Sequence, residues 1–168
     1  MAENWEVMDL SVKVKGLVLP NGLHIDEGEI AGREVSIGRD PFSLSTGPGS
    51  LAVVRVSCAS LQAFLVGLDL PHISEIEVTA EGGLLKVSAT ARVIVQIATT
   101  ALCALECEDG KRVNVRLESA EPSASRSLIE RQFAQINPVL DLSGLPFDLT
   151  VTDISVSDDG VVLRGDVG

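Results

Sequence analysis

Residues 135–149, QINPVLDLSGLPFDL, decide how this chain folds. An amphipathic stretch runs into Asn137-Pro138, and apolar residues resume directly after the proline. The residue before a proline disfavours the α-helical region, so a helix should end or kink at Asn137. We therefore expect a helix that lies against a curved sheet with an apolar groove between them. Residues 139–147 are expected to fold over that groove as a lip or to return to the sheet.

The helix that ends at Asn137 is predicted to begin near residue 122. Ser123 or Ser125 is expected to cap its start, because a serine oxygen can accept a hydrogen bond from the first free N–H groups. Its polar residues, Glu130, Arg131, Gln132 and Gln135, are expected to lie away from the sheet. Its apolar stripe consists of Leu128, Ile129, Phe133, Ile136 and Leu140.

A shorter helix of about ten residues is predicted within residues 57–71. Ser57 or Ser60 can cap its start, and Pro71 prevents it from continuing. The spacing i, i+3, i+4, i+7 places four apolar residues on one helical face, namely Leu61, Phe64, Leu65 and Leu68.

Alternation of apolar and polar residues predicts strands in most of the remaining chain. Residues 85–97 keep one apolar face throughout, which predicts one long strand with strong twist, coil or a bulge. Residues 40–50 are turn-rich and are predicted to form a loop, and Asp109-Gly110 predicts a hairpin. The order of elements predicts an α+β fold, in which a strongly curved antiparallel β-sheet wraps around amphipathic helices.

Length and composition narrow the class of protein. A chain of 168 residues is expected to form one domain, residues 1–168. Its apolar residues are almost all aliphatic, with four Phe, one Trp and no Tyr. The net charge of −11 opposes binding to phosphate backbones, so no nucleic-acid partner is expected. The first ten residues, MAENWEVMDL, do not resemble a signal peptide, so the chain as it stands is expected in the cytoplasm.

The sequence contains none of the common catalytic or metal-binding motifs. It has no GxSxG, P-loop, GxGxxG or HExxH pattern, and its two histidines, His24 and His72, are far apart. Cys58, Cys103 and Cys107 form no CxxC pair and are expected to be small buried thiols. We therefore expect no catalytic residues, no metal, no cofactor and no enzymatic activity.

The two apolar stripes allow two interpretations. Either they form an ordinary packed core, as in a structural or protein-interaction domain without a ligand, or they line a groove for hydrocarbon. Long alternating strands, few aromatic side chains and two amphipathic helices favour the groove. Because each buried CH₂ contributes about 0.8 kcal/mol, one acyl chain would bind firmly there.

The C-terminal segment resembles a known family. Within LIERQFAQINPVLDLSGLPFDLTVTDISVSDDGVVLRGDV, the Asn137-Pro138 step, the Leu140-Asp141-Leu142 step, Leu145-Pro146 and the glycine-ended hairpin through Gly160 resemble the LmeA-like phospholipid-binding family of bacteria. SCASLQAFLVG and ISEIEVTAEGGLLKVSATARV are also similar, so the likeness covers roughly residues 30–167. It implies a curled sheet wrapped on a helix, like tubular lipid-binding domains. It also implies phospholipid binding in cell-envelope lipid metabolism, and a periplasmic or envelope location reached through a leader.

Together these observations predict a non-enzymatic phospholipid-binding protein that holds acyl chains in an apolar groove between helix and curved sheet. Its role is expected in envelope or membrane lipid metabolism or transport, with a peripheral membrane contact. No oligomeric state is predicted. The residues expected to line the groove are Leu61, Phe64, Leu65, Leu68, Leu128, Ile129, Phe133, Ile136, Leu140 and Phe147.

Overall fold

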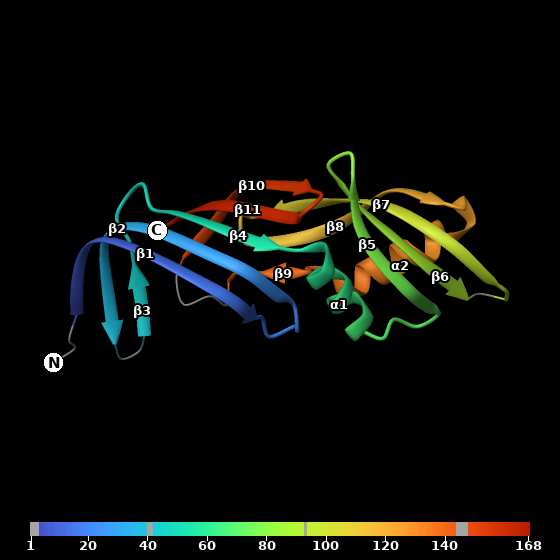
Figure 1. The fold of residues 1–168 in the computed structure, drawn as a ribbon, viewed down its shortest axis with the longest axis horizontal. Coiled ribbons are helices and arrows are strands. Elements are labelled where there is room, and N and C mark those ends of the chain that lie inside the picture. The colour runs from blue at the N-terminus through green and yellow to red at the C-terminus, as the bar shows by residue number, and fades with distance from the viewer. Residues whose placement is uncertain (1–3, 40–41, 93, 144–147) are drawn as a thin grey trace.

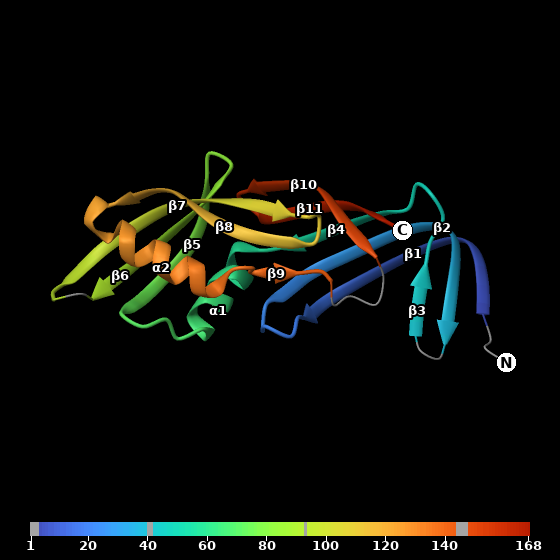
Figure 2. The same cartoon turned by 180° about the vertical axis from the view of Figure 1, so that it is seen from behind.

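The protein is elongated, with two antiparallel sheets following one another along its long axis (Figure 1). The structure is a computed structural model that describes residues 4–39, 42–92, 94–143 and 148–168. α2 lies along the second sheet, α1 lies where the two sheets meet, and both chain termini lie at the end formed by the first sheet (Figures 1 and 2). The arrangement confirms the α+β class, although the strands divide into two sheets rather than one.

The first sheet has the strand order β1-β2-β4-β11-β10, and β3 pairs with the other part of β2. It combines the N-terminal hairpin with the C-terminal hairpin, because β11 pairs with β4 over residues distant in sequence. Residues 42–45 form a strand, so the prediction of a loop throughout 40–50 was wrong there. The six strands are β1 (Asn4–Val18), β2 (His24–Arg39), β3 (Phe42–Ser45), β4 (Leu51–Val56), β10 (Leu149–Ser157) and β11 (Gly160–Val167).

The second sheet is a meander, as predicted, but it has an additional hairpin between β6 and β7 and one short strand added at its edge. It is strongly curled, and α2 runs along it (Figures 1 and 2). Its strands, in spatial order, are β5 (Ile73–Glu81), β6 (Leu84–Arg92), β7 (Gln96–Glu108), β8 (Arg112–Glu121) and β9 (Leu140–Asp141).

The expected long strand over residues 85–97 is in fact a hairpin. β6 ends at Arg92, which pairs with Gln96 at the start of β7. The sequence shows no break because β-branched residues continue through the turn, where glycine, asparagine or proline is usual. As a result, Ile94 is 95% exposed and Val95 is 62% exposed.

Both predicted helices are present. α1 (Cys58–Gly67) is capped by Ser57, whose side-chain oxygen accepts a hydrogen bond from the Ser60 N–H at 3.1 Å. α2 (Arg126–Ile136) follows a short 3₁₀ turn over Ser123–Ser125. Ser125 is the N-cap residue of α2, as predicted, but its side chain makes no capping hydrogen bond, because its hydroxyl donates to the Pro122 carbonyl at 2.7 Å. Neither helix is long and apolar enough, within the described residues, to cross a bilayer.

One hydrophobic core joins the two sheets. It contains Ile25 and Ala52 from the first sheet and Leu85 and Val113 from the second. α1 contacts β5 and β2, so it lies where the sheets meet, whereas α2 contacts β8. The buried side chains of the two sheets therefore form one continuous cluster.

Candidate lipid-binding site

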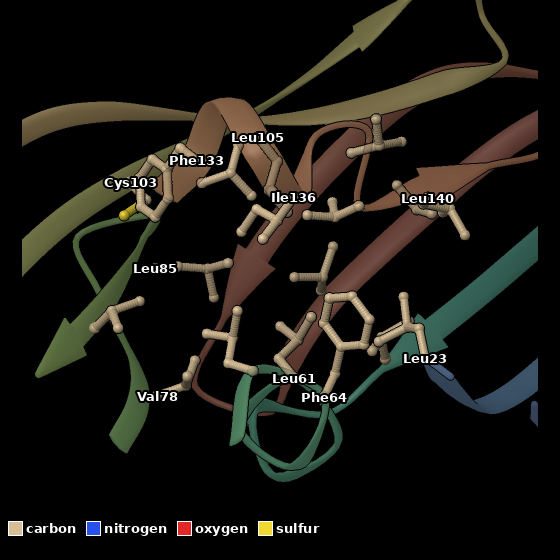
Figure 3. A pocket seen from close by; sticks show the side chains of 18 residues that line it. Leu23, Leu61, Phe64, Val78, Leu85, Cys103, Leu105, Phe133, Ile136 and Leu140 are labelled. Atoms are coloured by element: carbon tan, nitrogen blue, oxygen red, sulfur yellow. The ribbon is translucent and has the colours of Figure 1, made fainter. Parts of the chain in front are cut away.

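Two apolar cavities lie between the helices and the surrounding strands. The first has a volume of about 60 Å³, and its wall consists of aliphatic and aromatic side chains and the thiol of Cys103 (Figure 3). The second has a volume of about 40 Å³ and lies between α2, the start of β5, β6 and β7. They share four wall residues, Leu65, Val87, Phe133 and Ile136. The two cavities are therefore neighbours, separated by these side chains.

Seven of the ten residues expected to line a groove are found in these walls. Leu61, Phe64, Leu65, Phe133, Ile136 and Leu140 line the first cavity, and Ile129 lines the second. Figure 3 shows five of these side chains pointing toward one another from α1, α2 and β9, namely Leu61, Phe64, Phe133, Ile136 and Leu140.

Three of the ten residues are not placed in these walls. Leu68 packs against the core, and Leu128 is half-buried, but neither lines either cavity in the described part of the chain. Phe147 lies outside the described residues.

Other wall residues were not expected from the sequence. The inward faces of the meander contribute Val78, Leu85 and Val113, which strand alternation alone could have indicated. Leu23 comes from the turn between β1 and β2, and Val161 and Leu163 come from β11, which pairs with the distant strand β4.

Gln132 was expected to face away from the apolar stripe, and this was wrong. It is only 5% exposed and lines the second cavity beside Ile129 and Ile136. Residues three and four apart share a helical face. Ile129 lies three residues before Gln132 and Ile136 lies four residues after it, and both line the second cavity. Gln132 therefore lies on the same buried face of α2.

Asn137 ends α2 and connects it to the second sheet. Its backbone is extended, with φ −75° and ψ 140°. Its side-chain Oδ1 accepts a hydrogen bond from the Val115 N–H at 2.8 Å, and its Nδ2 donates to the Val115 carbonyl at 2.9 Å. The amide thus pairs with β8 as a strand backbone would, and the next residues continue that pairing when Leu140 pairs with Val113. This confirms that the helix ends at Asn137 and that the chain returns to the sheet.

A second contact ties this segment to the first sheet. The Asn21 side chain, in the turn between β1 and β2, donates to the Val139 carbonyl at 2.9 Å. The C-terminal end of α2 is therefore held on both sides. By contrast, no residue of Arg126–Ile136 hydrogen-bonds to a strand within the described residues; the Arg126–Glu130 pair lies within the helix. Apolar packing alone holds the body of α2 on the sheet.

The cavities are smaller than an acyl chain requires. Sites for small molecules usually have volumes of about 300–1,000 Å³, against about 60 and 40 Å³ here. Hydrocarbon can therefore enter only if the helices and the sheet move apart.

Cys103 offers a probe of this movement. It is fully buried in the wall of the first cavity, and burial raises the pKa of its thiol from 9.0 to about 12. Only the thiolate reacts with alkylating reagents. At pH 8 its thiolate fraction is therefore about 1,000-fold below that of a thiol with the ordinary pKa.

We expect iodoacetamide at pH 8 to modify Cys103 far more slowly than Cys58 and Cys107, which are both partly exposed. Peptide mass spectrometry gives the three rates in one sample, and unfolding in guanidinium should make them similar. Modification of native Cys103 as fast as Cys107 would contradict the closed arrangement.

A family model for LmeA-like phospholipid-binding proteins matches residues 4–166, which includes both sheets and both cavities. The chain belongs to the LmeA-like phospholipid-binding family. The match extends the resemblance noted from residue 30 onward to nearly the whole chain, and it supports lipid binding in general for this LmeA-like protein. Neither a curated protein nor a solved structure matches it. In the described ranges, no three His, Cys, Asp or Glu residues gather as metal ligands would.

Proposed function

We propose that this LmeA-like protein binds a phospholipid by taking an acyl chain into the apolar space between its helices and the curled sheet, without catalysing a reaction. The observation that carries the proposal is the first cavity, whose wall has no polar side chain apart from the Cys103 thiol. Such a wall excludes water and accepts hydrocarbon, at about 0.8 kcal/mol for each buried CH₂.

Binding requires an open state of the protein. α2 is pinned at its C-terminal end by the Asn137 side chain, whereas its N-terminal turns rest on apolar contacts. α1 is held more firmly, because Ser57 donates from its N–H to Asp26 at 2.6 Å and Gln62 accepts from the Val78 N–H at 3.1 Å. In the proposed open state, α2 swings away from the sheet, and the second cavity is the first part to widen.

The small cavity volumes favour the alternative of a fully packed structural or interaction domain. Native mass spectrometry, before and after organic extraction and after incubation with liposomes, separates the two functions. Bound phospholipid, or its uptake from liposomes, is expected for the proposed function. If only the mass of the lipid-free protein is detected under every condition, the packed domain is favoured.

The proposal includes a role in envelope or membrane lipid metabolism or transport, which the resemblance implies; the family description itself supports phospholipid binding. A protein in such a role must meet a bilayer to load and release its lipid. The turn between β6 and β7 is suited to this contact. It lies at the end of the molecule opposite the N-terminus (Figure 1), and it exposes Ile94 and Val95. The wall residues Ala89 and Thr99 of the second cavity pair with each other farther along the same hairpin.

Ile94→Asp should reduce association with phosphatidylcholine vesicles about tenfold or more. The reason is that burying an isoleucine in the interface contributes about 1.5–3 kcal/mol, which a carboxylate loses. Vesicle flotation measures the association. Met8→Asp is the control, because Met8 is 81% exposed on β1 in the other sheet. Equal losses in both variants, or no loss in either, would place the membrane contact elsewhere.

A further inference from the structure

The second cavity contains a buried polar group without a partner. Gln132 is only 5% exposed, and its Oε1 accepts no hydrogen bond from any described residue. A buried acceptor left unpaired costs the free energy of its desolvation, and few such groups persist in native proteins. Leucine or methionine would fill the same space on α2 without this cost. A ligand that forms a hydrogen bond with the amide would explain why glutamine is present.

The surroundings of Gln132 offer it no partner. Leu65, Ile129 and Ile136 beside it are apolar. The other buried polar residue in this wall, Thr99, donates its hydroxyl proton to the Ala89 carbonyl at 3.0 Å. Gln132 is therefore the polar group in this wall that is left to meet an incoming molecule.

The two neighbouring cavities differ in polarity. The first, which reaches toward the first sheet, has a wholly apolar wall apart from the Cys103 thiol. The second, which lies nearer the exposed turn between β6 and β7, contains Gln132 and Thr99. A molecule with a hydrocarbon part and an oxygen-containing part fits the two cavities in one direction only.

We propose that Gln132 binds the oxygen-rich linkage of the lipid, directly beside the acyl chain, and so sets the direction in which the lipid lies. The acyl chain occupies the first cavity, and the linkage occupies the second. A lipid hydroxyl donates to Oε1, or, after a half-turn of the amide, Nε2 donates to an ester carbonyl. This inference rests on the proposed function, and it adds a specificity-determining residue to it.

The test compares three lipids with identical chain lengths. Dipalmitoyl phosphatidylcholine offers ester carbonyls, dipalmitoylglycerol offers carbonyls and a hydroxyl, and the dialkyl ether analogue of phosphatidylcholine offers neither group. Competition for uptake, read by native mass spectrometry, gives the preference of each variant. The full chain should prefer the ester lipids to the ether lipid by about three- to tenfold, the effect of one hydrogen bond. A further advantage of dipalmitoylglycerol over dipalmitoyl phosphatidylcholine identifies the hydroxyl as the partner.

Gln132→Leu and Gln132→Met should still bind all three lipids but lose the preference, and they should unfold at a higher temperature than the native chain. Gln135→Leu is the matched control, because Gln135 is exposed on the same helix, and it should keep the preference. If the native chain shows no preference, or if Gln132→Leu retains it, the role of Gln132 is overturned while lipid binding stands. If no lipid binds to any variant, the proposed function itself fails.

Discussion

Phe133→Glu should abolish phospholipid uptake while leaving both sheets folded. Phe133 lies on α2 in the wall shared by the two cavities, and its side chain is only half-buried. A carboxylate at this point would have to lose its hydration whenever an acyl chain passed it, at a cost of several kcal/mol. In the closed protein the same carboxylate can turn toward water, and glutamate is a good helix former, so folding should survive.

The experiment pairs native mass spectrometry after incubation with liposomes and circular dichroism of the same samples. Ala134→Glu is the matched control, because Ala134 is the next residue of the helix and is exposed; it should take up lipid normally. Uptake by the folded Phe133→Glu variant would show that lipid does not pass this point. Loss of the fold in that variant, with Ala134→Glu unaffected, would favour the packed domain without a ligand.

Asn137→Ala should reduce the free energy of unfolding by about 2–4 kcal/mol. The substitution leaves the N–H and the carbonyl of Val115 without their partners on this side of β8, and each partly buried group left unpaired costs about 1–3 kcal/mol. In urea unfolding, the change should appear as a lower urea concentration at the midpoint, while the dependence of the unfolding free energy on urea concentration stays the same. A second effect should accompany it. In the proposed open state, Asn137 is the fixed point about which α2 turns, so the variant should exchange bound lipid faster.

Asn114→Ala is the control for this change. Asn114 lies next to Val115 on β8, but its side chain makes only an exposed contact of 3.3 Å with Glu108. Its removal should cost no more than about 0.5 kcal/mol. Equal destabilisation by the two substitutions would mean that the Asn137 amide does not hold α2 to the sheet.

The predictions from sequence succeeded for features that depend on residues close together in the chain. The apolar spacing within residues 57–71 and 122–137 predicted both helices, and Asn137-Pro138 predicted where the second helix ends. Alternation and Asp109-Gly110 predicted the meander. In each case the information lies within a few residues of the feature.

The predictions failed where position depends on distant partners. The division into two sheets follows from the pairing of β11 with β4, which no local pattern encodes. The turn after Arg92 was missed because its residues are as apolar as those of a buried strand. The burial of Gln132 was missed because polarity alone placed it toward solvent.

The sequence by itself determined the family, the two helices, the strands of the meander and the apolar character of the faces that meet. Tertiary structure alone decided how tightly those faces meet and where the remaining space lies. The physical reason is that periodicity shows which side of an element avoids water, whereas a cavity depends on how several such sides fit together. Leu163 lines the first cavity because β11 pairs with the distant strand β4, and the unpaired amide of Gln132 lines the second because α2 packs on the meander.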